Sequence, residues 1–188
     1  TGIQTGMVMT AQERDGVLDV ARRIEDAGFD SIWVGDHISF YIPILESLTL
    51  LEHLPDRTKF ADVGPGGGLP SIPCLLARDD LSAVLIESKE KKARFLDLAV
   101  EALGLSARAQ VANRQFTEVG PVGCTYVTCR ALDRFTERLP ALLRWAKRRP
   151  MLLFGGNNLR DALQKSRVNF VEKLMPLSEQ RFLFMTKP

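Results

Sequence analysis

Short apolar runs alternate with amphipathic stretches along nearly the whole chain. Runs of this length fit buried strands, whereas apolar residues three or four positions apart fit helices that pack on a sheet. Strands are therefore expected at 3–9, 31–34, 59–63, 83–86, 109–112, 125–128 and 151–154. Helices are expected from Thr10 as far as Gly28, and at 44–54, 71–77, 89–103, 132–147 and 159–164.

The last part of the chain changes this pattern. Residues 168–174 and 181–186 are expected to form two antiparallel strands, joined by Pro176-Leu177-Ser178. Repeated strand–helix units that end in a hairpin predict a three-layer, Rossmann-like α/β domain with a mostly parallel sheet.

Composition narrows the class of protein further. The chain has 188 residues, 45% of them hydrophobic, which is enough for one well-buried core. Three cysteines without CxxC spacing and two histidines do not suit a zinc site, so no metal is expected. No apolar run approaches the roughly 20 residues of a membrane span, and the first residues lack a secretory-signal pattern. We therefore expect a soluble cytoplasmic protein whose reduced cysteines are core residues.

The distribution of charge is more informative than its sum. The net charge of +2 is too small to indicate nucleic-acid binding by itself. Basic residues nevertheless gather in 141–150 and at Lys89, Lys91, Lys92 and Arg94. Either group fits a solvated helix face as well as a phosphate-binding surface.

A glycine-rich segment, Gly64-Pro65-Gly66-Gly67-Gly68, follows the strand expected at 59–63. Because glycine lacks Cβ, the backbone can take positive φ and a ligand can approach its N–H groups closely. Such a turn holds a pyrophosphate in dinucleotide-binding enzymes. Asp62 stands directly before the turn, where a carboxylate would repel phosphate but attract an ammonium group. This favours S-adenosylmethionine as the adenosine cofactor.

Glu87 ends the next expected strand and supplies the second indication of an adenosine cofactor. It follows Gly64 by 23 residues, close to the roughly 20-residue spacing at which an acidic residue reaches the ribose hydroxyls. The alternative is a tight turn with an unrelated surface glutamate.

Several motifs from about residue 46 onward resemble the bacterial small-subunit (16S) rRNA guanine-N7 methyltransferases. The motifs are ADVGPGGGLPSIP, LIESKEKKARFL, AVEALGL, YVTCRAL, LLFGG and SEQRFLFMTKP. The resemblance implies that residues 55–188 form a class I methyltransferase-type domain that binds S-adenosylmethionine and acts on ribosomal RNA. Ser71 and the run Asn113-Arg114-Gln115 depart from the family pattern, and the second departure bears on contacts to the adenine.

This resemblance also assigns site residues. The implied cofactor-binding residues are Asp62, Gly64, Gly66, Gly68 and Glu87. Arg130 is expected to position the reactants, with an ion pair to Asp133 or Glu137 as the alternative. The implied RNA-binding residues are Lys91, Lys92, Arg94 and Arg181, and an exposed hairpin charge is the alternative for Arg181. Guanine N7 has a free lone pair, so the reaction needs positioning rather than a general base.

Residues 21–37 (ARRIEDAGFDSIWVGDH) resemble a different family, the luciferase-like flavin- or deazaflavin-dependent monooxygenases. The resemblance implies two N-terminal βα units of TIM-barrel type over residues 1–54, and hence a chimera with its seam within about 44–59. His37 would lie near a flavin in a complete barrel. A quarter of a barrel cannot close, so flavin binding is not expected here.

Three functions remain open at this point. The first is a methyltransferase-type domain that binds S-adenosylmethionine or S-adenosylhomocysteine with weak or no catalysis, because the family's helical RNA-holding segment is replaced. The second is an artificial structural protein without biochemical function. The third, least favoured, is a flavin oxidoreductase. The sequence leaves open where the N-terminal strands join the sheet and what the oligomeric state is.

Overall fold

The computed structural model describes residues 41–187, except residues 122, 131 and 133. The strands and the helix expected before residue 41, and with them His37, lie outside these described residues. The same holds for most of the predicted barrel-like unit over 1–54, of which only 41–54 is described.

Seven strands form one sheet in the order β3-β2-β1-β4-β5-β7-β6. The strands from β3 to β5 run parallel, whereas β7 is antiparallel to both β5 and β6. The bounds are β1 (Lys59–Val63), β2 (Ser82–Ile86), β3 (Ala109–Ala112), β4 (Tyr126–Cys129), β5 (Met151–Gly155), β6 (Phe170–Leu174) and β7 (Phe182–Thr186). The predicted mostly parallel sheet with a C-terminal antiparallel hairpin is confirmed.

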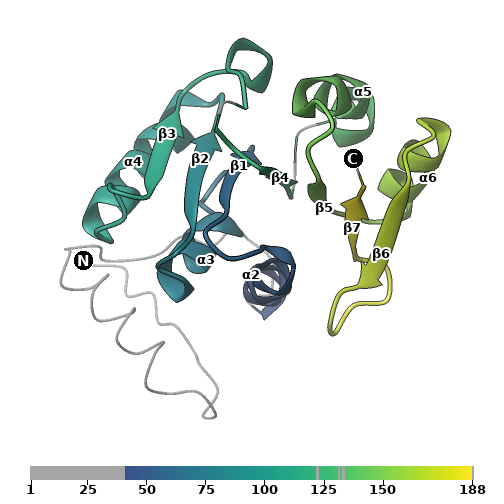
Figure 1. The fold of residues 1–188 in the computed structure, drawn as a ribbon, viewed down its shortest axis with the longest axis horizontal. Helices are drawn as coiled ribbons and strands as arrows, with labels where there is room; N and C mark the ends of the chain where they lie inside the picture. The colour runs from purple at the N-terminus through teal and green to yellow at the C-terminus, as the bar shows by residue number, and fades with distance from the viewer. Residues whose placement is uncertain (1–40, 122, 131, 133, 188) are drawn as a thin grey trace, which may run out of the picture.

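Helices cover both faces of this sheet, which gives three layers (Figure 1). The helices are α2 (Tyr41–His53), α3 (Ser71–Ala77), α4 (Glu90–Ala102), α5 (Phe135–Ala146) and α6 (Asn157–Lys165), with a 3₁₀ turn η1 (Phe116–Glu118). Buried residues of α2, α3 and α4 share one hydrophobic cluster, and those of α5 and α6 share the other.

The central strands are apolar at nearly every position because their side chains alternate between these two clusters. In β1, Phe60 packs with the α2–α4 cluster and Ala61 with the α5–α6 cluster. In β5, Leu152 and Leu153 divide in the same way. This arrangement explains why the strands appear in the sequence as continuous apolar runs rather than alternating ones.

Some helix and loop bounds differ from the expected ones. α2 begins at Tyr41 rather than at 44, since Pro43 lies in its first turn, where a missing N–H removes no helical hydrogen bond. α5 begins at Phe135 rather than at 132, because Arg134 has left-handed backbone (φ 52°). The hairpin connection spans 175–181 and is longer than the expected three residues. Within the described part of the chain, no helix is long and apolar enough to cross a membrane.

Candidate functional site

The glycine segment forms a tight turn between β1 and α3 at the carboxyl edge of the parallel strands. The Gly64 N–H donates to the Ile86 carbonyl at 2.9 Å, and the Gly68 N–H donates to the Pro65 carbonyl at 2.9 Å. Gly64, Gly66 and Gly68 have φ of 75°, 60° and 90°, whereas Gly67 does not have positive φ. The three glycines singled out from the sequence are thus the three that require left-handed backbone.

Gly68 is also the closest-packed glycine of the turn. A Cβ there would lie 2.4 Å from Ile72 Cδ1, whereas a Cβ at Gly67 would have no atom within 4 Å. We expect Gly68→Ala to lower the free energy of unfolding by at least about 2 kcal/mol, through left-handed strain and displacement of Ile72. Gly67→Ala is the matched control, with an expected change below about 1 kcal/mol. Urea denaturation measures both, and equal losses would contradict this account.

Glu87 connects the glycine turn to the start of α4. It is buried, its Oε2 accepts a hydrogen bond from the Gly66 N–H at 3.1 Å, and its Oε1 accepts one from the Lys89 N–H at 2.8 Å. Asn113 Nδ2 donates to the Glu87 backbone carbonyl at 3.1 Å. Each oxygen accepts one hydrogen bond here, and a carboxylate oxygen can accept two, so the fixed group can also accept from hydroxyls of a ligand.

Asp62 lies fully buried at the end of β1. Its Oδ2 accepts a hydrogen bond from the Ser71 hydroxyl, and its Oδ1 has no partner. Burial raises the pKa of the Asp62 carboxyl to about 7; the hydrogen bond from Ser71 and the charge of Arg130 lower it, and the charge of Glu87 raises it. An enclosed, half-satisfied carboxyl group beneath the turn suits a ligand that carries a positive charge.

Arg130, directly after β4, and Arg181, directly before β7, both bind Glu46 of α2. Glu46 is fully buried, Arg130 Nε donates to its Oε2, and Arg181 Nε donates to its Oε1 at 2.5 Å. The Arg130 and Arg181 side chains are 23% and 35% exposed. Of the alternatives raised from the sequence, Glu137 lies near Arg134 instead, at 4.0 Å, and Arg181 is not a free hairpin charge. Asp133, the other partner considered for Arg130, lies outside the described residues.

Three residues whose side chains hold this site together were not identified as site residues from the sequence. Glu46 is the only acidic residue in residues 41–51, and an isolated acid in an apolar helix is a signal that could have identified it. Ser71 and Asn113, noted only as departures from a family pattern, hold the Asp62 side chain and the Glu87 backbone.

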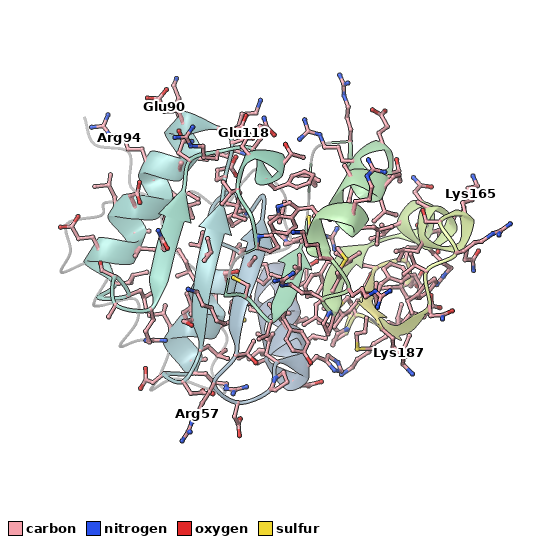
Figure 2. The ribbon with its side chains drawn as sticks, turned by 45° about the horizontal axis from the view of Figure 1, so that its top comes forward. Arg57, Glu90, Arg94, Glu118, Lys165 and Lys187 are labelled. Carbon is pink, nitrogen blue, oxygen red and sulfur yellow. The ribbon has the colours of Figure 1, made fainter. Side chains whose placement is uncertain are left out.

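The predicted RNA-binding residues of α4 are all exposed. They differ in how they lie relative to the glycine turn. Lys92 Nζ lies 3.9 Å from the position of a Cβ on Gly66, so this lysine lies over the turn. Arg94 points away from the body of the protein (Figure 2). Lys91 is exposed on the same helix. Within residues 41–187 as described, no group of three or more His, Cys, Asp or Glu side chains gathers as a metal site.

The three cysteines are core residues. Cys74, Cys124 and Cys129 are all buried and unpaired, as their isolated positions in the sequence predict. Burial raises the pKa of all three thiols, so they stay protonated and unreactive.

Two solved structures with a similar fold are methyltransferases. The chain matches the Bacillus subtilis tRNA methyltransferase TrmK with a TM-score of 0.61 and 16% identity, over 76% of this chain and 64% of that one. It matches the S-adenosylmethionine-dependent methyltransferase SibL with a TM-score of 0.63 and 12% identity, over 79% and 55% of the two chains. The sheet order and these similarities define a Rossmann-like α/β fold that these methyltransferases share.

Sequence comparison defines the family. The family model described as rRNA small subunit methyltransferase G (GidB) matches residues 40–182, so the chain belongs to this family. The protein of that name from Chromobacterium violaceum is 38% identical over 94 residues, 50% of this chain and 45% of its own length. Its counterpart from Frankia casuarinae is 35% identical over 131 residues, 66% and 49% of the two chains. The chain spans about half the length of the curated relatives it matches.

These findings confirm the resemblance to the rRNA methyltransferases. The family match begins at residue 40 and includes α2. The second resemblance, to the monooxygenases, falls at residues 21–37, before the family match and outside the described residues.

Proposed function

We propose that this chain binds S-adenosylmethionine at the glycine turn and directs its methyl group to a guanine N7 of small-subunit ribosomal RNA. The observation that carries the proposal is the Glu87 carboxylate, fixed by the Gly66 N–H beside the turn. Family membership supports the same cofactor and the same class of substrate.

The residues present fit the cofactor's polar groups. Both Glu87 oxygens have remaining acceptor capacity for the ribose hydroxyls. Gly64 and Gly66 have left-handed backbone and no side chain of their own, so a ligand can approach the N–H groups of the turn closely. Asp62 lies beneath the turn with one unpartnered oxygen, where its charge would attract the ammonium group of the methionine part.

The chain's contribution to the reaction is positioning. When bound, S-adenosylmethionine supplies an electrophilic methyl carbon next to a sulfonium leaving group. Because guanine N7 carries a free lone pair, this chain would need no residue that removes a proton before the methyl group is accepted. Orientation by fixed groups supplies most of the rate gain in such a displacement. Arg130, held by buried Glu46 at the carboxyl end of β4, is the positively charged residue we assign to position the RNA.

Calorimetric titration with S-adenosylhomocysteine tests the cofactor part of this proposal directly. Binding heat and a rise in melting temperature with ligand concentration are expected. Transfer of a labelled methyl group to small ribosomal subunits tests the substrate part. No heat and no thermal shift at millimolar ligand would refute cofactor binding.

The raised pKa of Asp62 predicts that cofactor affinity depends on pH. Below about pH 7 the Asp62 carboxyl is largely protonated, so it offers no charge to the ammonium group. As the pH rises through about 7 the carboxyl ionises, and the affinity for S-adenosylhomocysteine is expected to rise with it. Asp62→Asn cannot ionise and should remove this dependence. Titrations at several pH values measure both proteins, and identical pH profiles would contradict the assignment.

We further propose that the part of residues 1–54 that precedes the family match at residue 40 is a graft of two TIM-barrel-type βα units, and that catalysis is weaker than cofactor binding. The motif at 21–37 supports the graft. Replacement of the family's RNA-holding segment would weaken turnover without touching the glycine turn. A single-turnover methyl-transfer rate close to that of a full-length relative would contradict this. The alternative, an artificial structural protein, predicts no binding of S-adenosylhomocysteine at all.

A further inference from the structure

A basic depression lies on the edge of the sheet opposite the glycine turn. It is an open hollow of about 300 Å³ between the end of α5, the start of β5, the α6–β6 connection and the end of β7. Its positively charged lining residues are Arg148, Arg149, Arg167 and Lys187. In Figure 2, Lys187 lies at the lower edge of the molecule, whereas Glu90 and Glu118 lie at the upper edge, where β2 and β3 end.

The positive charge of this basic depression is not neutralised within the described residues. No carboxylate lines it. The Arg149 guanidinium donates only to backbone carbonyls, of Cys124 at 2.7 Å and of Ala146 at 3.2 Å. The side chains of Arg148, Arg167 and Lys187 are exposed and have no hydrogen bond or ion pair to any described residue. Four positive charges around one hollow repel one another, so an anion there would be stabilising.

The backbone at two of these residues is unfavourable for arginine. Arg148 and Arg167 have φ of 61° and 53°, at positions just after α5 and α6. Glycine or asparagine usually occupies such left-handed positions after a helix, since other residues cost roughly 1–2 kcal/mol there. The turn itself therefore does not account for arginine at either place. Glycine at either position would remove the positive charge and relieve the backbone at the same time.

We propose that the basic depression binds phosphate groups of an RNA backbone, as a second contact surface remote from the cofactor turn. Arginine pairs with phosphate through two parallel N–H···O bonds, and each neutralised phosphate releases counterions. No aromatic side chain lines the hollow, so bases have nothing to stack on and binding is independent of sequence. The choice of RNA as the source of the phosphates rests on the proposed function.

A consequence is that RNA reaches two opposite edges of the domain. Lys92 lies over the glycine turn at the carboxyl edge, and the basic depression lies at the amino edge. A folded RNA that follows the protein surface between the two edges can engage both. The depression then strengthens binding without contacting the reacting base.

The test uses single variants, Arg148→Gly and Arg167→Gly, and the double variant of the full chain. Fluorescence anisotropy with labelled poly(U) RNA is followed over a range of NaCl concentrations. The double variant is expected to bind roughly tenfold more weakly at about 0.1 M salt, with a log–log salt slope smaller by about 2. Its melting temperature should be unchanged or higher, because glycine suits left-handed backbone. Loss of affinity with no loss of stability separates a binding role from a structural one.

Arg57→Gly is the matched control. Arg57 also has left-handed backbone (φ 55°), and Figure 2 shows it at the same lower edge, outside the depression. Arg57→Gly removes one positive charge from the same kind of backbone position, and the affinity for poly(U) should not change. A loss equal to that of Arg148→Gly would reveal a general effect of net charge and overturn the proposal.

Two further measurements complete the test. The double variant should bind S-adenosylhomocysteine as the wild type does. Failure of the wild type to bind it would refute the proposed function alone, whereas unchanged poly(U) binding by the variants would refute the second RNA surface alone. If the variants lose binding to vesicles of anionic phospholipid but keep poly(U) binding, the depression serves a membrane surface and the proposal is wrong.

Discussion

Glu87→Ala is expected to weaken the binding of S-adenosylhomocysteine by about 100-fold. Hydrogen bonds to a charged group contribute roughly 1.5–3 kcal/mol each, so losing two ribose contacts costs about 3 kcal/mol. Isothermal titration calorimetry measures the change. Glu87 also accepts the N–H groups of Gly66 and Lys89, so a loss of stability is expected as well. Glu87→Gln keeps the shape of the side chain and one acceptor oxygen, so its affinity should lie between those of the wild type and Glu87→Ala.

The control for this prediction is Glu90→Ala. Glu90 is an exposed acid in the first turn of α4, three residues after Glu87, and its side chain makes no hydrogen bond or ion pair with any described residue. Its replacement removes the same charge and should leave the affinity within about twofold, since a solvated charge is strongly screened. If Glu87→Ala lowers stability but leaves the affinity unchanged, Glu87 does not contact the ligand and the assignment of the ribose site is wrong.

Glu46→Ala is expected to lower the free energy of unfolding by about 3 kcal/mol. The substitution leaves the partly buried guanidinium groups of Arg130 and Arg181 without their common partner, and breaking a buried ion pair from one side costs roughly 3–5 kcal/mol. We place the effect at the lower end because both arginines are partly exposed. Urea denaturation followed by circular dichroism measures it.

Glu52→Ala is the matched control on the same helix. Glu52 pairs with Lys173 across an exposed surface, so its removal should change stability little. Glu46→Gln keeps two polar atoms in place and should recover part of the loss. Equal destabilisation by Glu46→Ala and Glu52→Ala would show that the buried cluster contributes no more than a surface ion pair.

The part of the fold that local patterns determine could be predicted from the sequence. The mostly apolar run before the glycines became β1 with the predicted bounds, because a strand covered on both faces is apolar at nearly every position. The glycine turn was predictable because only glycine takes the three left-handed positions without strain. The position of Glu87 beside the glycine turn was predictable, because one crossover helix separates β1 from β2 and sets a nearly constant spacing in sequence between the turn and the end of β2.

Contacts between distant segments could not be predicted in the same way. Glu46 meets Arg130 and Arg181 over 84 and 135 residues of sequence, and no periodicity connects them. The hydrogen bond from Ser71 to Asp62 depends on how the first turn of α3 sits against the end of β1. The barrel-like interpretation of residues 1–54 rests on a motif outside the described residues and stays a prediction.

The ties between α2 and the C-terminal hairpin bear on the order in which the protein folds as it is synthesised. Arg181 and Lys173 bind Glu46 and Glu52, over 135 and 121 residues. When α2 leaves the ribosome, neither Arg130 nor Arg181 has yet been made, and burying the Glu46 carboxylate alone would be costly. Helix α2 should therefore stay undocked while β1 to β3 assemble. The first helix of the described chain would be among the last to reach its final position.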